Sequence, residues 1–150
     1  MGLEADIHQT KPFQSEFHKA VVNILFSNNW VLEKLRQYLE QEDITPQQYN
    51  ILRILRGCSE PISTLQIRER MLDKMSNASR MVDRLVLKEL VSKKVHRKDK
   101  RLVDVTITEK GLRILQRLDG RAAEIDAITE KLSDEEVQTL NLLLDKMRTC

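Results

Sequence analysis

Glycine, proline and cysteine are all scarce in this chain of 150 residues, which has 4 Gly, 3 Pro and 2 Cys. So few glycines argue against a phosphate-cradling cofactor loop, which needs them where the backbone approaches the ligand. The cysteines, Cys58 and Cys150, form neither a C-x-x-C pair nor a disulfide framework. His8, His18 and His96 are scattered, without the spacing of metal ligands. We therefore expect no metal, no cofactor and a reducing compartment.

Long apolar runs are missing as well. None approaches the roughly 18 residues that a membrane-spanning helix needs. The first ten residues, MGLEADIHQT, have neither the basic nor the apolar region of a signal peptide. No set of nucleophile and base residues suggests catalysis. We expect a cytoplasmic protein that is not an enzyme and that does not enter a membrane.

The charge of the chain is unevenly distributed. The net charge is only +2, and 41% hydrophobic with 32% charged residues is typical of a folded, helix-rich protein. Residues 45–111, however, hold 15 Lys and Arg against 8 Asp and Glu, a net charge of +7, and the rest of the chain has a net charge of −5. A basic middle between acidic ends indicates that one segment meets a polyanion.

Hydrophobic periodicity predicts helices on either side of a short hairpin. Apolar residues recur at spacings of three and four in 12–41 and again from 108 to 132, which predicts two long helices. Three shorter helices and two β-rich runs lie between them, the order of a winged helix. We expect a mainly α fold with a small β-hairpin, in which a winged helix-turn-helix DNA-binding domain (45–111) is flanked by a helical dimerisation domain (12–41 and 112–148).

Helix starts are marked by capping residues. A Ser or Thr cap followed three residues later by Gln or Glu forms a capping box, in which each side chain bonds the other residue's backbone. Such boxes are Thr45 with Gln48, Ser63 with Gln66, and Ser133 with Glu136. Ser76 and Thr108 are predicted as single caps.

The helix that begins at Ser76 has the polar face of a DNA-recognition helix. The N-terminal part of such a helix reaches base edges in the major groove, where Asn pairs with adenine and Arg with guanine. We expect Arg84 and Lys88 to touch phosphates, and Asp83 to brace a neighbouring Arg or to accept from a cytosine amine. A solvated face of an ordinary surface helix is the alternative. The candidate residues are Ser76, Asn77, Ser79, Arg80, Asp83, Arg84 and Lys88.

The stretch HRKDKR, residues 96–101, puts four cations and one carboxylate at the tip of the hairpin. Such a tip suits the narrow minor groove, whose negative potential attracts Arg. Asp favours tight turns and can hold an Arg through a two-pronged pair, so the carboxylate shapes the tip and the cations bind. Protection of a sheet edge by charge is the alternative. The candidate wing residues are Arg97, Lys98, Asp99, Lys100 and Arg101.

Three stretches together resemble the MarR (multiple antibiotic resistance regulator) family of bacterial transcription factors. They are ITPQQYNILRIL, SNASRMVDRLVLKELV and RKDKRLVDVTITEKG. The wing pattern of the family falls on Asp99, Lys100, Arg101, Ile107, Thr108 and Gly111. The resemblance implies a homodimer that binds double-stranded DNA, with recognition helices in the major groove and wings in the minor groove. The two-fold symmetry of such a dimer in turn implies an inverted-repeat operator. The resemblance also implies repression relieved by a small phenolic or other anionic effector, or by an oxidant.

Two departures from the family pattern stand out. The segment MLDKMS, residues 71–76, lacks the Gly that many such turns carry, and Glu89 stands where a Gly usually follows the recognition helix. Because a left-handed C-cap favours Gly, we expect the helix to end in some other way near Leu90. Oxidant-sensing members carry a cysteine near the start of the first helix, and this chain has none there.

An effector pocket is expected between the first two helices and the winged module. Asn28 and Trp30 interrupt the apolar stripe of the first helix, and Tyr49 and Arg53 are candidates to face the same cleft. An inter-subunit hydrogen bond of Asn28 that sets register is the alternative. The rival function is a winged-helix module for protein–protein assembly, which would not need wing cations and a polar helix face together.

Overall fold

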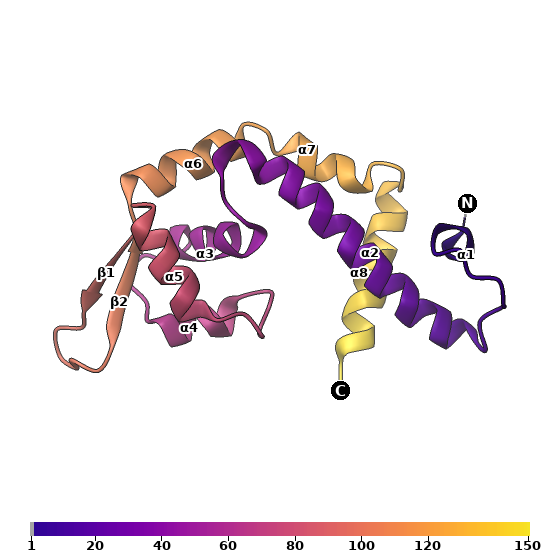
Figure 1. The fold of residues 1–150 in the computed structure, drawn as a ribbon, viewed down its shortest axis with the longest axis horizontal. Helices are drawn as coiled ribbons and strands as arrows, with labels where there is room; N and C mark the ends of the chain where they lie inside the picture. Colours follow the sequence, from indigo (N-terminus) through magenta and orange to yellow (C-terminus); the bar gives the residue numbers. More distant parts are fainter. Residues whose placement is uncertain (1) are drawn as a thin grey trace.

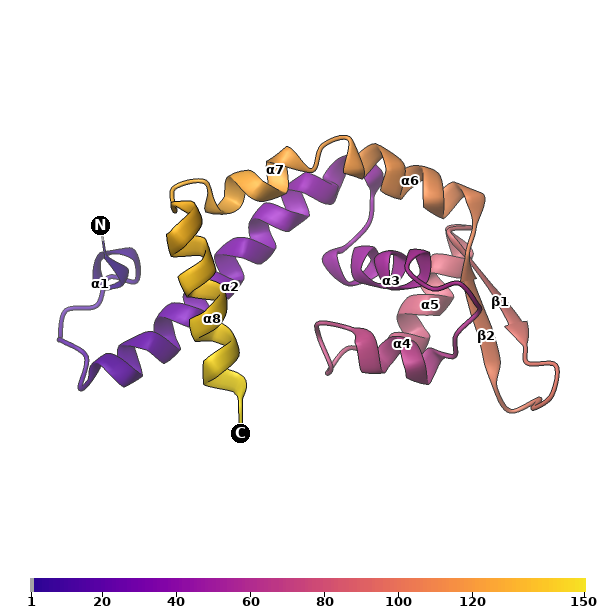
Figure 2. The ribbon, with the colours of Figure 1, turned by 180° about the vertical axis from the view of Figure 1, so that it is seen from behind.

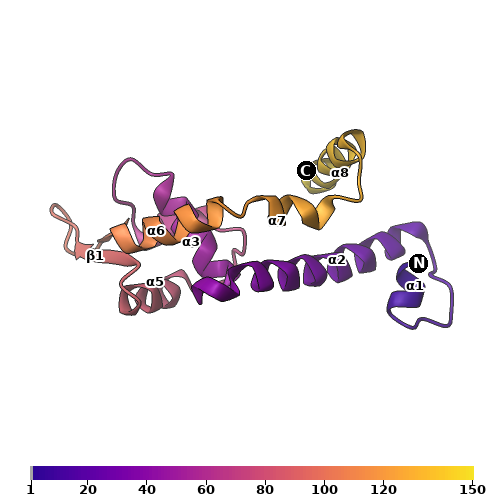
Figure 3. The ribbon, with the colours of Figure 1, turned by 90° about the horizontal axis from the view of Figure 1, so that it is seen from above.

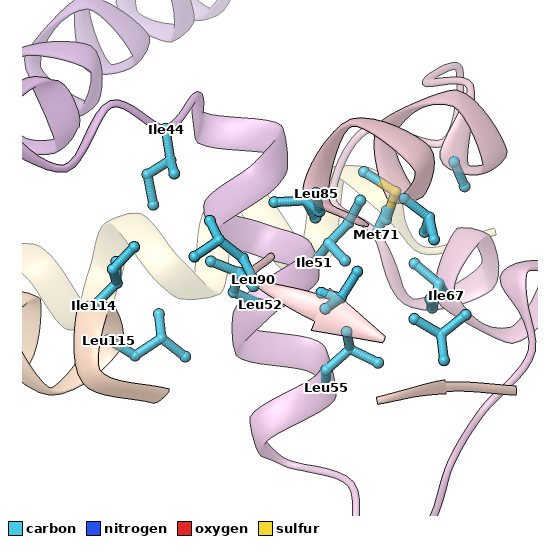
Figure 4. Packing of buried hydrophobic residues seen from close by; sticks show 14 of the residues in the cluster. Ile44, Ile51, Leu52, Leu55, Ile67, Met71, Leu85, Leu90, Ile114 and Leu115 are labelled. Atoms are coloured by element: carbon cyan, nitrogen blue, oxygen red, sulfur yellow. The ribbon is translucent and has the colours of Figure 1, made fainter. Parts of the chain in front are cut away.

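Apolar side chains from five helices, the last of which is α6 (Glu109–Asp119), and from both strands of the hairpin meet in one core. The computed structural model of the chain describes residues 2–150. Ile51, Leu52, Ile67, Leu85 and Leu115 are fully buried in this core, and Figure 4 shows them pointing toward one another from four helices. The helix-turn-helix is therefore held by the periodic apolar residues of its own helices together with α6.

The elements follow the order that the sequence predicts, with additions. In the winged module, β1 pairs with β2 in antiparallel register, from Val91 opposite Ile107 to Val95 opposite Val103, which confirms a mainly α fold with one β-hairpin. The chain runs through α1 (Leu3–Asp6), α2 (Glu16–Leu39), η1 (Glu40–Glu42), α3 (Pro46–Arg56), α4 (Thr64–Arg70), α5 (Ala78–Leu87), β1 (Val91–Val95), β2 (Val103–Ile107), α6 (Glu109–Asp119), α7 (Ala123–Asp126), η2 (Ala127–Thr129) and α8 (Asp134–Arg148).

The first long helix starts later than predicted. Its N-cap is Ser15, whose hydroxyl accepts from the backbone N–H of His18, so α2 begins at Glu16 instead of near Pro12. A short helix, α1, precedes it and was not predicted. The side chain of Lys19 in α2 lies 2.7 Å from Glu4 of α1, an ion pair that hydrophobic periodicity does not reveal.

The continuous helix predicted from 108 to 132 is wrong. The chain breaks between α6 and α7, where the N–H of Arg121 bonds the carbonyl of Leu118 at 2.9 Å and the N–H of Ala122 bonds that of Asp119 at 3.2 Å. These three-residue bonds replace the four-residue bonds of an α-helix. The hydroxyl of Tyr38 also donates to the Leu118 carbonyl, at 2.5 Å, so a side chain from α2 occupies this carbonyl where the helix would have continued.

The hairpin joins the helices through closely packed backbone. Ile62, in the loop before α4, exchanges backbone hydrogen bonds of 3.3 and 2.8 Å with Val105 of β2. Thr108 caps α6 as predicted, because its hydroxyl accepts from the N–H of Gly111. A Cβ at Gly111 would overlap the Leu90 carbonyl oxygen and lie 2.7 Å from Cγ1 of Ile107. Only glycine lets α6 start this close to the end of α5.

The recognition helix differs from the prediction at both ends. Its N-cap is Asn77, whose Oδ1 accepts from the N–H of Arg80 at 3.1 Å, so the assignment of the cap to Ser76 is wrong. At its C-terminus, Glu89 adopts a left-handed conformation with φ of 61°, and the N–H of Leu90 bonds the carbonyl of Leu85 at 3.0 Å. This is the termination normally made by glycine, so the expectation of another kind of ending is also wrong.

Two ion pairs attach α6 to the N-terminal half of the chain. Arg117 donates from Nε and a terminal nitrogen to the two carboxylate oxygens of Glu42, at 2.9 and 2.7 Å, and Arg56 of α3 lies 2.6 Å from Asp119. The hydrogen bond from Arg117 lowers the pKa of Glu42 below its ordinary value. The side chain of Glu42 is 13% exposed, so this pair is shielded on one side.

The outer helices extend away from the winged module. In Figure 1, α2 runs diagonally from the core toward the N-terminus while the hairpin projects at the opposite end. Figure 2 shows α6 above α3 and α7 above α2. Figure 3, from above, shows α8 standing off from α2. No residue of α8 is fully buried, and most of its apolar side chains, among them Leu143 and Met147, are exposed.

We predict that Glu89→Gly raises the free energy of unfolding by about 0.5–1 kcal/mol. A left-handed conformation costs an L-residue roughly 1–2 kcal/mol, and glycine avoids this cost. The gain is smaller than that, because glycine also has more conformational freedom to lose when the chain folds. Glu89 lies 3.7 Å from Lys110, and such an exposed pair contributes little. The measurement is urea denaturation at fixed protein concentration. Glu89→Ala, which keeps the strain, and Glu69→Gly in α4 should show no gain.

We also predict that Glu42→Gln lowers the melting temperature at pH 7 by about 2 °C. The pKa of Glu42 is lower in the folded chain than in the unfolded chain, where it is near 4.3. The stabilisation is therefore complete above about pH 4.3 and disappears as pH falls through the lowered pKa. Melting curves of both proteins between pH 3 and 7 should converge at the acid end; a constant difference would contradict this ion pair.

Candidate nucleic-acid interface

Helix α5 presents one buried and one exposed face. Ala78, Val82 and Leu85 are buried in the core, whereas Ser79, Arg80, Asp83 and Arg84 are exposed on the other side. The spacing of three and four that predicted an amphipathic helix produces this separation. Four of the seven predicted recognition residues therefore share one solvent-facing surface, and Asn77 lies at its N-terminal end.

Two charged residues of this helix have partners that the sequence did not reveal. Asp83 accepts from Nζ of Lys93 in β1 at 2.7 Å, so the expectation that it braces Arg80 or Arg84 is wrong. Lys88 donates to the backbone carbonyl of Asp43, in the link between α2 and α3, and lies 3.7 Å from the Asp43 carboxylate. Lys88 is thus drawn toward that link, and the role of a free phosphate-binding cation does not suit it.

The N-terminal cap also limits what Asn77 can do. Its Oδ1 already accepts from the backbone N–H of Arg80. A two-pronged pair with adenine needs both the oxygen and the nitrogen of the amide, so Asn77 would have to leave the cap to make it. Ser76, immediately before the cap, is half-buried and contributes less surface than its position in the sequence suggests.

The wing tip has the geometry that its sequence predicts. Asp99 accepts from the backbone N–H of Arg101 at 3.0 Å, and its two carboxylate oxygens accept from the Arg101 side chain at 3.1 and 3.2 Å. Nδ1 of His96, which the sequence did not single out, accepts from the N–H groups of Lys98 and Asp99 at 3.2 and 3.1 Å. Both sides of the turn are therefore fixed by side-chain acceptors.

The electrostatics of the tip favour anions. The hydrogen bonds of Arg101 hold the pKa of Asp99 below its usual range, so its carboxylate is ionised at neutral pH. The Arg101 side chain is nonetheless 90% exposed, and Arg97, Lys98 and Lys100 are also exposed. A rigid turn thus holds four cations in water, with one carboxylate that orients a single one of them.

The four predicted effector residues do not come together. Arg53 lies over the ring of Tyr49, with 5.6 Å between the guanidinium carbon and the ring centre, whereas Asn28 and Trp30 are exposed on α2. Next to Tyr49, the Tyr38 ring makes an edge contact at 6.2 Å, and Arg121 lies 5.1 Å over Tyr38. Sequence analysis missed Tyr38 and Arg121, because only the fold brings them beside Tyr49.

A polar hollow of about 390 Å³ lies nearby, where α2 meets α3 and the end of α5. None of the four predicted effector residues lines it. Its walls carry the carboxylates of Glu33, Glu40 and Asp43 as well as Arg36 and Lys88. Within residues 2–150, no group of three or more His, Cys, Asp or Glu side chains is placed to hold a metal ion, and no helix is long and apolar enough to cross a membrane.

Comparison with known proteins adds to this geometry. The sequence model of the MarR family matches residues 44–103. The chain is 31% identical to the multiple antibiotic resistance protein MarR of Escherichia coli over 115 residues, which cover 75% of this chain and 79% of that protein. The chain belongs to the MarR family.

Two further comparisons agree with this membership. The chain is 30% identical over 105 residues to the HTH-type transcriptional repressor MdtR of Bacillus subtilis, covering 69% of this chain and 67% of MdtR. The crystal structure of a mutant E. coli MarR complexed with operator DNA superposes with a TM-score of 0.81 at 27% identity. That match covers 93% of this chain and all of the MarR chain, so the fold of this MarR-family member is confirmed over nearly its full length.

Proposed function

We propose that this MarR-family chain is a transcriptional regulator that binds double-stranded DNA in a sequence-specific manner. The observation that carries the proposal is the wing tip, where Asp99 holds Arg101 in a fixed turn while the Arg101 side chain stays 90% exposed. Free cations on a rigid hairpin suit the narrow minor groove. The mutant E. coli MarR that shares this fold was crystallised with operator DNA.

Residues 45–111 form the DNA-binding domain in this proposal. Ser79, Arg80 and Arg84 on the exposed face of α5 enter the major groove, and Arg97, Lys98, Lys100 and Arg101 follow the adjacent minor groove. Near this surface, Asp83 pairs with Lys93 and Asp99 pairs with Arg101. Among the described residues, neither Arg80 nor Arg84 forms an ion pair. The net charge of +7 in this domain supports attraction to phosphates.

Residues 12–41 and 112–148 form a dimerisation domain in the same proposal. Phe17, Val21 and Leu25 are 88, 56 and 60% exposed along one side of α2, and Leu143 and Met147 of α8 are 59 and 57% exposed. Apolar stripes of this size are rarely left in water by a monomer. A two-fold homodimer would cover them, and its symmetry implies an inverted-repeat operator with half-sites about 10–10.5 bp apart.

Repression relieved by a small phenolic or anionic effector is the regulatory part of the proposal. Tyr38, Tyr49, Arg53 and Arg121 lie together at the junction of α2, α3 and α6. Aromatic rings and guanidinium groups are suited to a ring that carries a negative charge. MdtR, a relative of this chain, is a transcriptional repressor. A repressor of this kind would act in the cytoplasm.

The proposal predicts that Arg101→Ala weakens DNA binding about tenfold or more without lowering stability, because an exposed wing charge contributes little to the fold. Operator sequences are first selected from random duplexes, and the dissociation constant is then measured between 50 and 200 mM salt. The slope of log K against log salt should fall by about one for each phosphate that the variant no longer neutralises. Arg113→Ala, an equal charge change on α6, is the matched control and should bind normally.

Within the same experiment, Asp99→Ala tests the geometry of the tip. Removal of a negative charge should strengthen binding to DNA on electrostatic grounds alone. We expect weaker binding, because the turn and the Arg101 side chain lose their acceptor. Asp104→Ala removes an equal charge from β2 and should not weaken binding. Tight, salt-insensitive binding to another protein, with none to DNA, would instead favour an assembly module.

The proposed dimer predicts that deletion of 133–150 removes much of the interface and lowers operator affinity, although every proposed DNA contact remains. In the full-length chain, Leu143→Asp should shift the protein toward monomer, whereas Asn141→Asp, on the other side of α8, should not. Sedimentation at micromolar concentration measures both. A full-length chain that sediments as a monomer contradicts the proposed dimer.

A further inference from the structure

Met75, in the turn between α4 and α5, is held in water although its side chain is apolar. It is 93% exposed and precedes the first residue of α5 by three positions. The turn is fixed by Asp73, whose Oδ1 accepts from the N–H of Met75 at 3.0 Å and whose carbonyl accepts from the N–H of Ser76 at 3.3 Å. An exposed side chain on a hydrogen-bonded turn can be presented to a ligand in a defined position.

Met75 lines a hollow of about 350 Å³ between the N-terminal ends of α4 and α5. Its apolar wall is Met75 together with Leu65 of α4, which is 62% exposed. Its one charged side chain is Arg68, and the polar residues around it are Thr64, Ser76, Asn77 and Ser79. The hollow is thus continuous with the α5 surface that we propose to enter the major groove.

The charge of this hollow distinguishes it from the others. The hollow at the junction of α2 and α3 carries three carboxylates, and the one between α7 and α8 carries those of Asp126, Glu130 and Asp134. None of the residues that line the hollow at Met75 carries a carboxylate. A duplex with its phosphates therefore meets no carboxylate in the lining of this hollow, and Arg68 attracts it.

The cap at Asn77 limits how the first turn of α5 can recognise an A·T pair. Because Oδ1 of Asn77 accepts from the N–H of Arg80, the two-pronged bond to adenine is not available while the cap is intact. The other distinguishing group of an A·T pair in the major groove is the C5-methyl of thymine, which is recognised by apolar contact. Methionine suits such a contact because its side chain is flexible and polarisable.

We infer that Met75, with Leu65 behind it, contacts the C5-methyl group of a thymine in each half-site and is a specificity-determining residue. The inference rests on the proposed function, since it assigns one contact within that interface. Recognition of this base pair then depends on an apolar group outside the recognition helix, in addition to the polar residues of α5.

The test replaces each thymine of the selected operator in turn by deoxyuridine, which lacks only the methyl group. Binding of the full-length protein is measured by fluorescence anisotropy at fixed salt. For the wild-type protein, each half-site should contain one thymine whose replacement alone raises the dissociation constant about fourfold, which is the effect of about one buried methyl group. Met75→Ala should bind the unmodified operator more weakly and reduce this ratio to about one.

Leu72→Ala is the matched control. Leu72 is 89% exposed in the same turn and does not line the hollow, so its variant should keep the fourfold ratio. We expect both variants to fold, because both side chains are exposed in the native protein. A melting curve like that of the wild-type protein checks this. Leu65→Ala should lower the ratio in the same direction as Met75→Ala.

Two results would overturn the inference while the proposed function stands: no thymine whose methyl group matters to the wild-type protein, or a Met75→Ala variant with the wild-type ratio. In both, binding itself is sequence-specific and depends on salt. If the wild-type chain selects no sequence from random duplexes, the proposed function is wrong and the inference falls with it.

Discussion

The hydrogen bond from the Tyr38 hydroxyl to the Leu118 carbonyl is the contact on which the arrangement of the helices depends. It joins the end of α2 to the end of α6, across 80 positions of sequence. Burial raises the pKa of Tyr38 to about 12, so the hydroxyl keeps its proton and remains a donor. The bond marks the point at which α6 ends, and beyond this break α7 lies along α2 (Figure 2).

Local patterns in the sequence predict the local structure well. The capping boxes at Thr45, Ser63 and Ser133 all form, because both partners lie three residues apart and need no help from the rest of the fold. The bond between Asp99 and Arg101 is predictable for the same reason. Ser76 and Asn77 are both good caps, and the choice between neighbours depends on which one the turn from α4 brings into an extended conformation.

Contacts between distant segments are where prediction fails. Asp83 pairs with Lys93 and Lys88 with Asp43, and in each case the partner comes from another element that only the fold brings close. The break after α6 is hidden for a similar reason, since the apolar stripe continues through it and the Tyr38 hydroxyl comes from α2. Hydrophobic spacing predicts that a residue is buried, but it does not predict which segment of the chain packs against that residue. Asn28 and Trp30, which were expected to face the same cleft as Tyr49 and Arg53, are exposed on α2.

The length of α2 gives this junction a mechanical consequence. Helix α2 has 24 residues, and at a rise of 1.5 Å per residue it is about 36 Å long. Tyr38 lies near the end of α2 that meets the winged module, and the opposite end is its outer end. A tilt of about 5° at the outer end displaces the winged module by about 3 Å, close to the 3.4 Å spacing of successive base pairs. In the dimer proposed above, a change of only a few degrees in the angle at which the outer end of α2 meets the partner subunit would put a recognition helix out of step with its half-site.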